Sequence, residues 1–100
     1  MLDAVFAIMQ EELALDITGM PFELENRTNC ILIYLYGQYI GNINIEKSHI
    51  VFHRVYVRRG ENAICKVTLS DPGCFSIIKT RIIDSLSEIH RKKYNGGTIV

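Results

Sequence analysis

The chain contains no tryptophan, only two prolines, and three cysteines without a C-x-x-C spacing. An odd number of cysteines does not suit a disulfide framework, so Cys30, Cys65 and Cys74 are expected to be free thiols in a reducing, cytoplasmic environment. The first residues also lack the basic start and continuous apolar run of a secretory signal, because Glu11 and Glu12 interrupt them. Export is therefore not expected.

Long apolar runs are also missing. The longest, residues 30–36, is roughly a third of what a membrane-spanning helix needs, so no membrane association is expected. A glycine-rich phosphate loop is absent too, because Gly96 and Gly97 follow the last predicted helix, whereas such a loop precedes one. The length suits one domain, assigned to residues 1–96, with a C-terminal tail at 97–100.

The residues that are present are typical of a globular domain, with 48% apolar and 22% charged side chains. The net charge is zero, but it is unevenly distributed. Residues 1–46 hold seven acidic residues and one basic residue, a net charge of −6, whereas residues 47–100 hold four acidic and ten basic residues, a net charge of +6. Such a chain can pair head to tail with a second copy, or offer its basic half to an acidic partner.

Two segments have helical periodicity. Residues 2–16 place apolar side chains at spacings of three and four, and Gly19 follows them. The second helix is predicted to begin after Asp71, a good N-cap, with Pro72 at the first helical position, and to end at residues 95–96. Its apolar stripe consists of Phe75, Ile78, Ile82, Leu86 and Ile89.

The middle of the chain changes to strand periodicity. Four strands are predicted, at residues 30–36, 39–45, 49–58 and 62–70. Short turns between them favour an antiparallel meander, so the expected fold class is α+β with the order α-β-β-β-β-α. The segment before the first strand is predicted to be a loop whose Phe22 and Leu24 pack against the core.

Turn chemistry predicts the strand register. Glycine at the first central position of a two-residue turn at 37–38 suits type II′ and pairs Leu32 with Ile43. Three-residue turns after the next two strands would pair Ile43 with Val51 and Val51 with Leu69, so that apolar side chains oppose one another. One face, the inner face, would then pack against helices.

This register divides the apolar residues between the core and an outer face. The predicted core comprises Val5, Phe6, Met9, Leu32, Ile43, Val51, Val55, Cys65, Val67, Ile78, Ile82 and Leu86. The outer face provides the candidate partner-binding residues, which are Ile31, Ile33, Leu35, Ile40, Ile50, Phe52, Arg54, Tyr56, Arg58 and Lys66. Either one helix covers each face, or both pack on the inner face and a partner covers the outer one.

No catalytic, metal-binding or cofactor-binding set is expected. His49 and His53 share the predicted inner face with Cys65, but they lack the paired spacing of a zinc site. A Cys65 nucleophile with His53 as its base would lack an orienting acid and an oxyanion donor. Cys74, in the first turn of the second helix, is the thiol expected to react first.

The expected function is therefore that of a small non-enzymatic binding protein, which acts through protein–protein interaction as a homodimer. The frequent Ile, Asn, Lys and Tyr suit an AT-rich genome, such as that of a phage, plasmid or pathogen, whose small accessory and inhibitor proteins often act without catalysis. The alternative is nucleic-acid binding, with the aromatic and basic end of the outer face stacking bases and contacting phosphates. No small-molecule substrate is identified.

Overall fold

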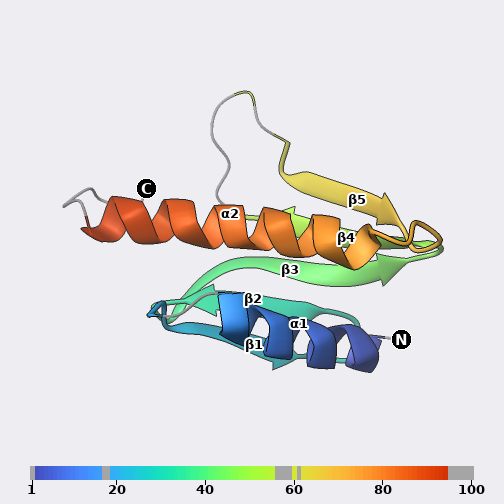
Figure 1. Ribbon diagram of the computed structural model, residues 1–100, viewed down its shortest axis with the longest axis horizontal. Helices are drawn as coiled ribbons and strands as arrows, with labels where there is room; N and C mark the ends of the chain where they lie inside the picture. The colour runs from blue at the N-terminus through green and yellow to red at the C-terminus, as the bar shows by residue number, and fades with distance from the viewer. Residues whose placement is uncertain (1, 17–18, 56–59, 61, 95–100) are drawn as a thin grey trace.

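The computed structural model of the chain describes residues 2–16, 19–55, 60 and 62–94. Two helices flank five strands in the chain (Figure 1), and these are α1 (Leu2–Asp16), β1 (Phe22–Asn26), β2 (Ile31–Leu35), β3 (Gln38–Glu46), β4 (His49–Arg54), β5 (Ile64–Thr68) and α2 (Cys74–Tyr94). The predicted α+β class is confirmed. The structure adds one strand, β1, to the four expected.

The strands form one antiparallel sheet in the order β1-β2-β3-β4-β5, so each strand pairs with its neighbours in the chain. Both helices lie on the same side of this sheet (Figure 1), with α1 packed along β1 and α2 along β4 and β5. The molecule therefore has two layers. We call the side under the helices the covered face and the other side the open face.

The core lies between the helices and the covered face. Its buried members are Val5, Met9, Leu13, Ile31, Ile33, Leu35, Ile40, Ile43, Ile50, Phe52, Cys74, Ile78, Ile82, Leu86 and Ile89. The predicted stripe of α2 is confirmed, with Phe75 only partly buried at its start. Among the other predicted core residues, Phe6, Cys65 and Val67 are partly buried against this cluster.

Three predicted core residues lie elsewhere. Leu32 and Val51 belong to the open face, because Ile31 and Phe52, beside them on β2 and β4, face the helices. Val55 follows the end of β4 and is 61% exposed. The predicted faces of Leu32 and Val51 were wrong because the predicted strand register was wrong. The predicted burial of Val51 is confirmed, since it is fully buried on the open face.

The turn between β2 and β3 is the first source of this error. Leu35 pairs with Gln38, so Tyr36 and Gly37 are the central residues, with φ of 53° and 75°. Positive φ at both positions is the type I′ pattern, which rarely includes a tyrosine. Here the Tyr36 ring stacks on His90 of α2 with centroids 5.7 Å apart, and its hydroxyl lies 2.7 Å from Nδ1 of His90. A tertiary contact thus supports a turn that local preference does not predict.

A β-bulge in β3 follows this turn. Tyr34 pairs with Tyr39, but Ile33 pairs with Gly41, so Ile40 is the additional residue. Ile40 is buried with the covered-face residues. Gly41 passes so close to β4 that a Cβ at this position would collide with the carbonyl oxygen of His53.

The later turns are also shifted. Glu46 pairs with His49 around a two-residue turn in which Lys47 has a φ of 54°, so Ile43 pairs with Phe52 rather than with Val51. Strand β4 ends at Arg54, and residues 56–59 lie outside the described residues.

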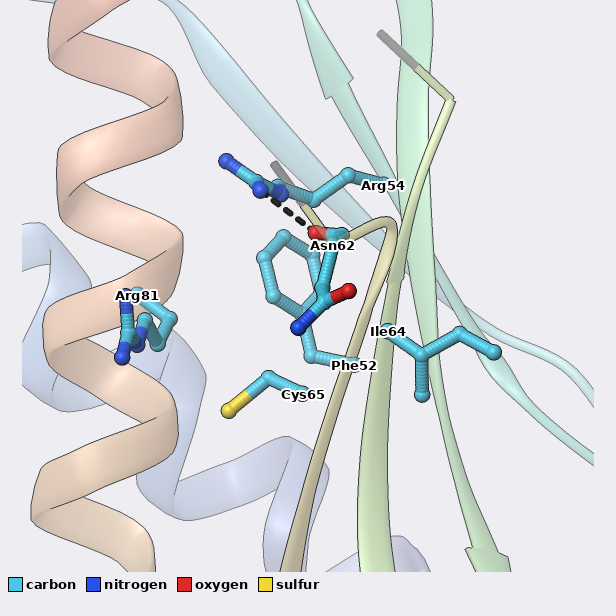
Figure 2. A pocket seen from close by; sticks show the side chains of 6 residues that line it. All are labelled: Phe52, Arg54, Asn62, Ile64, Cys65 and Arg81. Carbon is cyan, nitrogen blue, oxygen red and sulfur yellow. Dashed lines mark hydrogen bonds between the residues drawn. The ribbon is translucent and has the colours of Figure 1, made fainter. Parts of the chain in front are cut away.

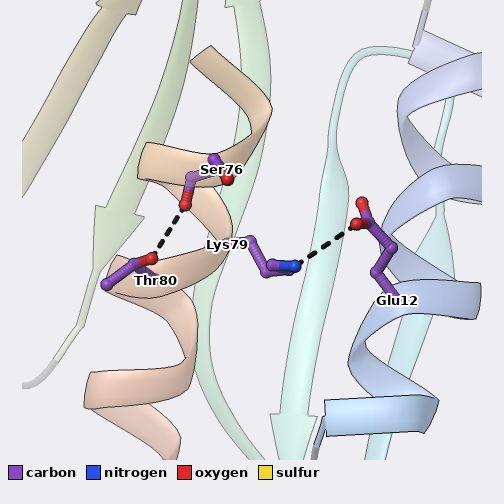
Figure 3. A network of polar contacts seen from close by, with 4 residues as sticks. All are labelled: Glu12, Ser76, Lys79 and Thr80. Carbon is purple, nitrogen blue, oxygen red and sulfur yellow. Dashed lines mark hydrogen bonds and ion pairs between the residues drawn. The ribbon is translucent and has the colours of Figure 1, made fainter. Parts of the chain in front are cut away.

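Polar contacts lie before the start of α2 and between the two helices. Asp71 Oδ1 accepts a hydrogen bond of 2.8 Å from the backbone N–H of Gly73, in a turn that precedes the helix. Because α2 begins at Cys74, the predicted helix start, with Asp71 as the N-cap and Pro72 as the first helical residue, was two residues too early. Lys79 of α2 lies 3.3 Å from Glu12 of α1 and joins the two helices (Figure 3). The predicted helix end at 95–96 lies outside the described residues.

Candidate functional site

The structure places most of the predicted partner-binding residues inside the protein. Six of them belong to the buried core, and these are Ile31, Ile33, Leu35, Ile40, Ile50 and Phe52. The prediction that they form an exposed apolar face was wrong, because both helices pack on that face. The apolar area that seemed to require a partner is covered by α1 and α2 of the same chain.

The remaining predicted residues do not form one patch. Arg54 is on the covered face at the end of β4, where its Nη2 donates a hydrogen bond of 2.6 Å to the backbone oxygen of Asn62 (Figure 2). Lys66 is on the open face, because it pairs with Val51. Tyr56 and Arg58 lie outside the described residues. The expected aromatic and basic end is thus divided between the two sides of the sheet.

The open face is the side of the sheet that neither helix covers. Its side chains alternate with those of the core, and they are Glu23, Glu25, Leu32, Tyr34, Tyr39, Asn42, Asn44, His49, Val51, His53, Ile64, Lys66 and Thr68. An antiparallel sheet can expose one face to water, and a polar composition is then expected. This face is instead mixed, so its apolar members are of interest.

Apolar and aromatic side chains occupy the middle of the open face. Tyr34 and Tyr39 lie side by side with ring centroids 5.9 Å apart. Tyr39 is 37% exposed and Ile64 is 49% exposed, whereas Val51 between them in the sheet order is fully buried. Leu32 and Ile64 lie in one row across the strands, with the polar residues Asn42 and His53 between them. We call Leu32, Tyr34, Tyr39 and Ile64 the apolar strip of the open face.

Hydrogen bonds hold the tyrosines in place. The Tyr34 hydroxyl donates to Glu25 at 3.2 Å, and the Asn42 side-chain amide donates to the Tyr39 hydroxyl at 2.7 Å. Desolvation, and after it the charge of the Glu25 carboxylate, raises the pKa of Tyr34 above its ordinary value. Both rings are therefore held in place, and the Tyr34 hydroxyl stays neutral at physiological pH.

Asn44 lies on β3, the central strand of the open face. Its Oδ1 atom is buried and accepts no hydrogen bond within the described part of the chain. A buried acceptor that receives no hydrogen bond lowers the stability of the folded protein.

Charge varies across the open face in the order of the strands. Strand β1 contributes Glu23 and Glu25, while β5 contributes Lys66. Glu25 also lies 3.1 Å from Arg27, which follows β1. The β1 edge is therefore acidic and the β5 edge is basic.

The chemistry considered for the histidines changes with the register. His53 is on the open face, whereas Cys65 pairs with Phe52 on the covered face. The sheet separates the two side chains, so they cannot act as a nucleophile and its base. No group of three or more His, Cys, Asp or Glu side chains that could hold a metal ion occurs among the described residues.

The fold defines a two-layer α+β protein with one uncovered sheet face. No family model, curated protein or solved structure matches the chain. In the described part of the chain, neither helix is long and apolar enough to cross a membrane.

Proposed function

We propose that the protein is a small non-enzymatic binding module that forms a homodimer through its open face. The observation that carries the proposal is the apolar strip of Leu32, Tyr34, Tyr39 and Ile64, which the protein's own helices leave uncovered. Apolar side chains that gather on one surface are typical of an interaction site. Fixed tyrosines suit this role, because they bury much area with little loss of conformational freedom.

The size of the face suits such an interface. Strands about 4.8 Å apart, with a rise of about 3.3 Å per residue, give a five-stranded sheet of this length a footprint on the order of 500 Å². A standard interface buries roughly 800 Å² of accessible surface on each partner. Side chains that project from such a footprint can supply an area of this order.

Charge favours a second copy in one orientation. A two-fold axis along the strands would place the acidic β1 edge of each copy over the basic β5 edge of the other. A two-fold axis perpendicular to the strands, in the plane of the interface, would instead place β1 of one copy over β1 of the other. Glu23 and Glu25 would then lie near the same two residues of the second copy. The first arrangement brings opposite charges together and the second brings like charges together. The open face is therefore complementary in charge to a second copy only when the two-fold axis runs along the strands.

Nucleic acid is the less favoured partner. Phe52, the aromatic residue expected to stack a base, is fully buried. The exposed Tyr39 ring lies beside Tyr34, whose hydroxyl is bonded to the Glu25 carboxylate, and this negative charge would repel phosphates. The open face therefore suits protein association in the cytoplasm better than a phosphate backbone.

The experiment is a measurement of mass in solution at micromolar concentration. The wild type is expected at twice the chain mass of 11.4 kDa. Tyr39→Asp and Ile64→Asp should each shift it to a single chain, because they place a charge in the apolar strip. Ile77→Asp is the matched control, since Ile77 is an exposed isoleucine on α2, outside the open face.

The salt dependence of binding distinguishes a protein partner from a nucleic-acid partner. The dimer should persist at about 0.5 M salt, because apolar burial is not screened. A monomeric wild type, or a dimer that only Ile77→Asp dissociates, would contradict the proposal. Binding of single-stranded oligonucleotides that is lost steeply with salt would support the alternative function instead.

A further inference from the structure

A second uncovered apolar surface lies on α1, on the side that faces away from the sheet (Figure 1). Helix α1 buries Val5, Met9 and Leu13 in the core. Its opposite side is exposed and mostly apolar, and we define the α1 face as Ala4, Ala7, Ile8, Glu11, Ala14 and Leu15. Ile8 is 36% exposed and Leu15 is 74% exposed. Helix α1 is thus apolar on two sides, although the protein covers only one of them.

Helix α2 lies in the same layer and has the polar outer side that α1 lacks. Its exposed positions, among the side chains that the structure describes, are Ser76, Ile77, Thr80, Arg81, Asp84 and Arg91. Ile77 is the one apolar residue of this set. A helix that meets water on one side is expected to be polar there, whereas a helix that is apolar all round is normally buried. The composition of α1 is therefore that of a helix with a second contact surface.

The exposed residues of α1 follow the spacing of a helix–helix seam. Ala4, Ile8, Glu11 and Leu15 are separated by four, three and four residues, which is the a and d spacing of a heptad. Ile8 and Leu15 take equivalent positions two turns apart, where they can insert between side chains of a facing helix. Ala4 and the neighbouring Ala7 are small, so they allow that helix to approach closely.

The charge of α1 indicates the kind of partner. Helix α1 contains no basic residue, and its exposed carboxylates within the described side chains are Asp3 and Glu11. Asp3 accepts a hydrogen bond of 2.8 Å from the neutral side-chain amide of Asn26, and Glu11 lies within the seam itself. Glu12 differs, because Lys79 of α2 lies 3.3 Å from its carboxylate. The seam is therefore apolar with a negative charge at its middle.

This charge disfavours a second copy and a lipid surface as the occupant. Pairing α1 with α1 of another copy would bring two acidic helices together, and the polar outer side of α2 would not cover Ile8 and Leu15. Carboxylates on the face would also be repelled by anionic lipids.

We infer that the α1 face binds an amphipathic, basic α-helix of a foreign protein. The a and d positions of that helix would pack on Ile8 and Leu15, and a Lys or Arg among them would pair with Glu11. A single polar residue in such a seam fixes the register of the two helices. Helix α1 is about 22 Å long, so the interface is small and the complex is expected to be weak and reversible.

The test uses a synthetic helical peptide of three heptads, with Ile and Leu at a and d and Lys at e and g. Its like charges oppose pairing with itself. Fluorescence anisotropy of the labelled peptide should show saturable binding to the whole chain, and amide shifts in NMR spectra should centre on residues 4–15. The same peptide with Glu in place of Lys should bind about tenfold more weakly, because its charges repel those of α1.

Substitutions on the two helices give the decisive comparison. Leu15→Ser and Ile8→Ser should each weaken binding of the Lys peptide about tenfold, because each removes an apolar contact. Ile77→Ser is the matched control, since Ile77 is 39% exposed on α2, and it should change the affinity by less than about twofold. Glu11→Lys should weaken binding of the Lys peptide and strengthen binding of the Glu peptide.

The inference is overturned if the Lys peptide shows no saturable binding, or if Ile77→Ser weakens it as much as Leu15→Ser. Two other outcomes would overturn it by identifying another occupant. Adsorption to phosphatidylcholine vesicles that Leu15→Ser abolishes would identify a lipid surface, and dissociation of a wild-type dimer by Leu15→Ser would identify a second copy. Tyr39→Asp, which is expected to be a single chain, should bind the peptide as tightly as the wild type, so this test is separate from that of the dimer.

Discussion

Gly41 shows how one residue limits the packing of two strands. A Cβ at this position would fall on the carbonyl oxygen of His53 and 3.1 Å from the Phe52 ring. Neither neighbour can move freely, because one is sheet backbone and the other is in the core. Gly41→Ala is therefore expected to lower the free energy of unfolding by about 1–3 kcal/mol, measured by chemical denaturation.

Gly73→Ala is the matched control for this substitution. Its Cβ would meet only the Asp71 side chain, at 3.5 Å, and Gly73 does not have a positive φ. Alanine there should leave stability unchanged or raise it by up to about 1 kcal/mol, because it restricts the unfolded chain. Equal losses in both variants would mean that the bulge at Gly41 is not tightly packed.

The cysteines give a residue-scale prediction that reverses the expectation from sequence. Cys74 begins α2, but it is only 2% exposed and its sulfur contacts the Leu69 carbonyl oxygen at 3.9 Å. Cys30 and Cys65 are partly exposed. Mass spectrometry after brief alkylation should therefore find Cys74 labelled last. Rapid labelling of Cys74 in the folded protein would show that the start of α2 opens locally.

At the scale of elements, α2 contributes much of the core. Ile82 is fully buried at the middle of its stripe, so Ile82→Ala is expected to lower the free energy of unfolding by about 2–5 kcal/mol. Ile77→Ala on the same helix removes the same atoms from a side chain that is 39% exposed, and it should cost less than about 1 kcal/mol. Similar losses in both variants, read from denaturation curves, would mean that α2 packs through another face.

The helices and strand order were predictable from sequence, but the faces of the strands were not. Ile43 pairs with Ile31 and Phe52, one position away from the predicted Leu32 and Val51. A shift by one residue transfers a whole strand to the other face, so β2 and β4 were reversed. Strand β5 shifted by three, also an odd number, and its Cys65 and Val67 kept the predicted side.

The physical reasons for these shifts are not local. The sequence of β2, residues 31–35, is apolar or aromatic at every position, so its pattern does not distinguish the faces. Tyr36 has a positive φ, and its side chain contacts His90, which is 54 residues away in sequence. Strand β1 was detectable, because Phe-Glu-Leu-Glu-Asn at residues 22–26 alternates strictly.

The same errors removed the predicted site. The apolar residues of β2 were expected to be shielded from water by a partner. They are indeed shielded from water, but by α1 and α2 of the same chain. The Tyr34 and Tyr39 pair of the open face was missed, because the predicted register, which pairs Leu32 with Ile43, places Tyr36 and not Tyr34 opposite Tyr39. Of the predicted site residues that the structure describes, only Lys66 is on the open face, and Arg54 is on the covered face.

At the scale of the whole molecule, the strand order converts the charge asymmetry of the sequence into a spatial one. The acidic N-terminal part forms α1 and β1 at one side of the sheet, and the basic C-terminal part forms β5 and α2 at the other (Figure 1). A meander produces this separation directly, because neighbours in sequence are neighbours in space. The charge separation of the chain therefore runs across the strands, from the acidic β1 edge to the basic β5 edge. Two stacked copies place opposite charges over each other only when these directions are antiparallel.

This dipole gives a test of how the two copies are oriented. In the proposed dimer the β1 edge of each chain lies over the β5 edge of the other, so E23K and K66E each place like charges on facing edges. Both positions are exposed, so the fold should tolerate the changes. Each variant alone is expected to weaken self-association roughly two- to fivefold in sedimentation measurements at low salt, the effect of rim charges.

Mixing the two variants separates orientation from general electrostatics. In a dimer of one E23K chain and one K66E chain, both facing edges again carry opposite charges, so the mixture should associate more tightly than either variant by itself. The difference should vanish at about 0.5 M salt, while the association of the wild type persists through its apolar strip. If the mixture instead behaves as the average of its components, the acidic and basic edges do not face each other, and the two-fold axis does not run along the strands.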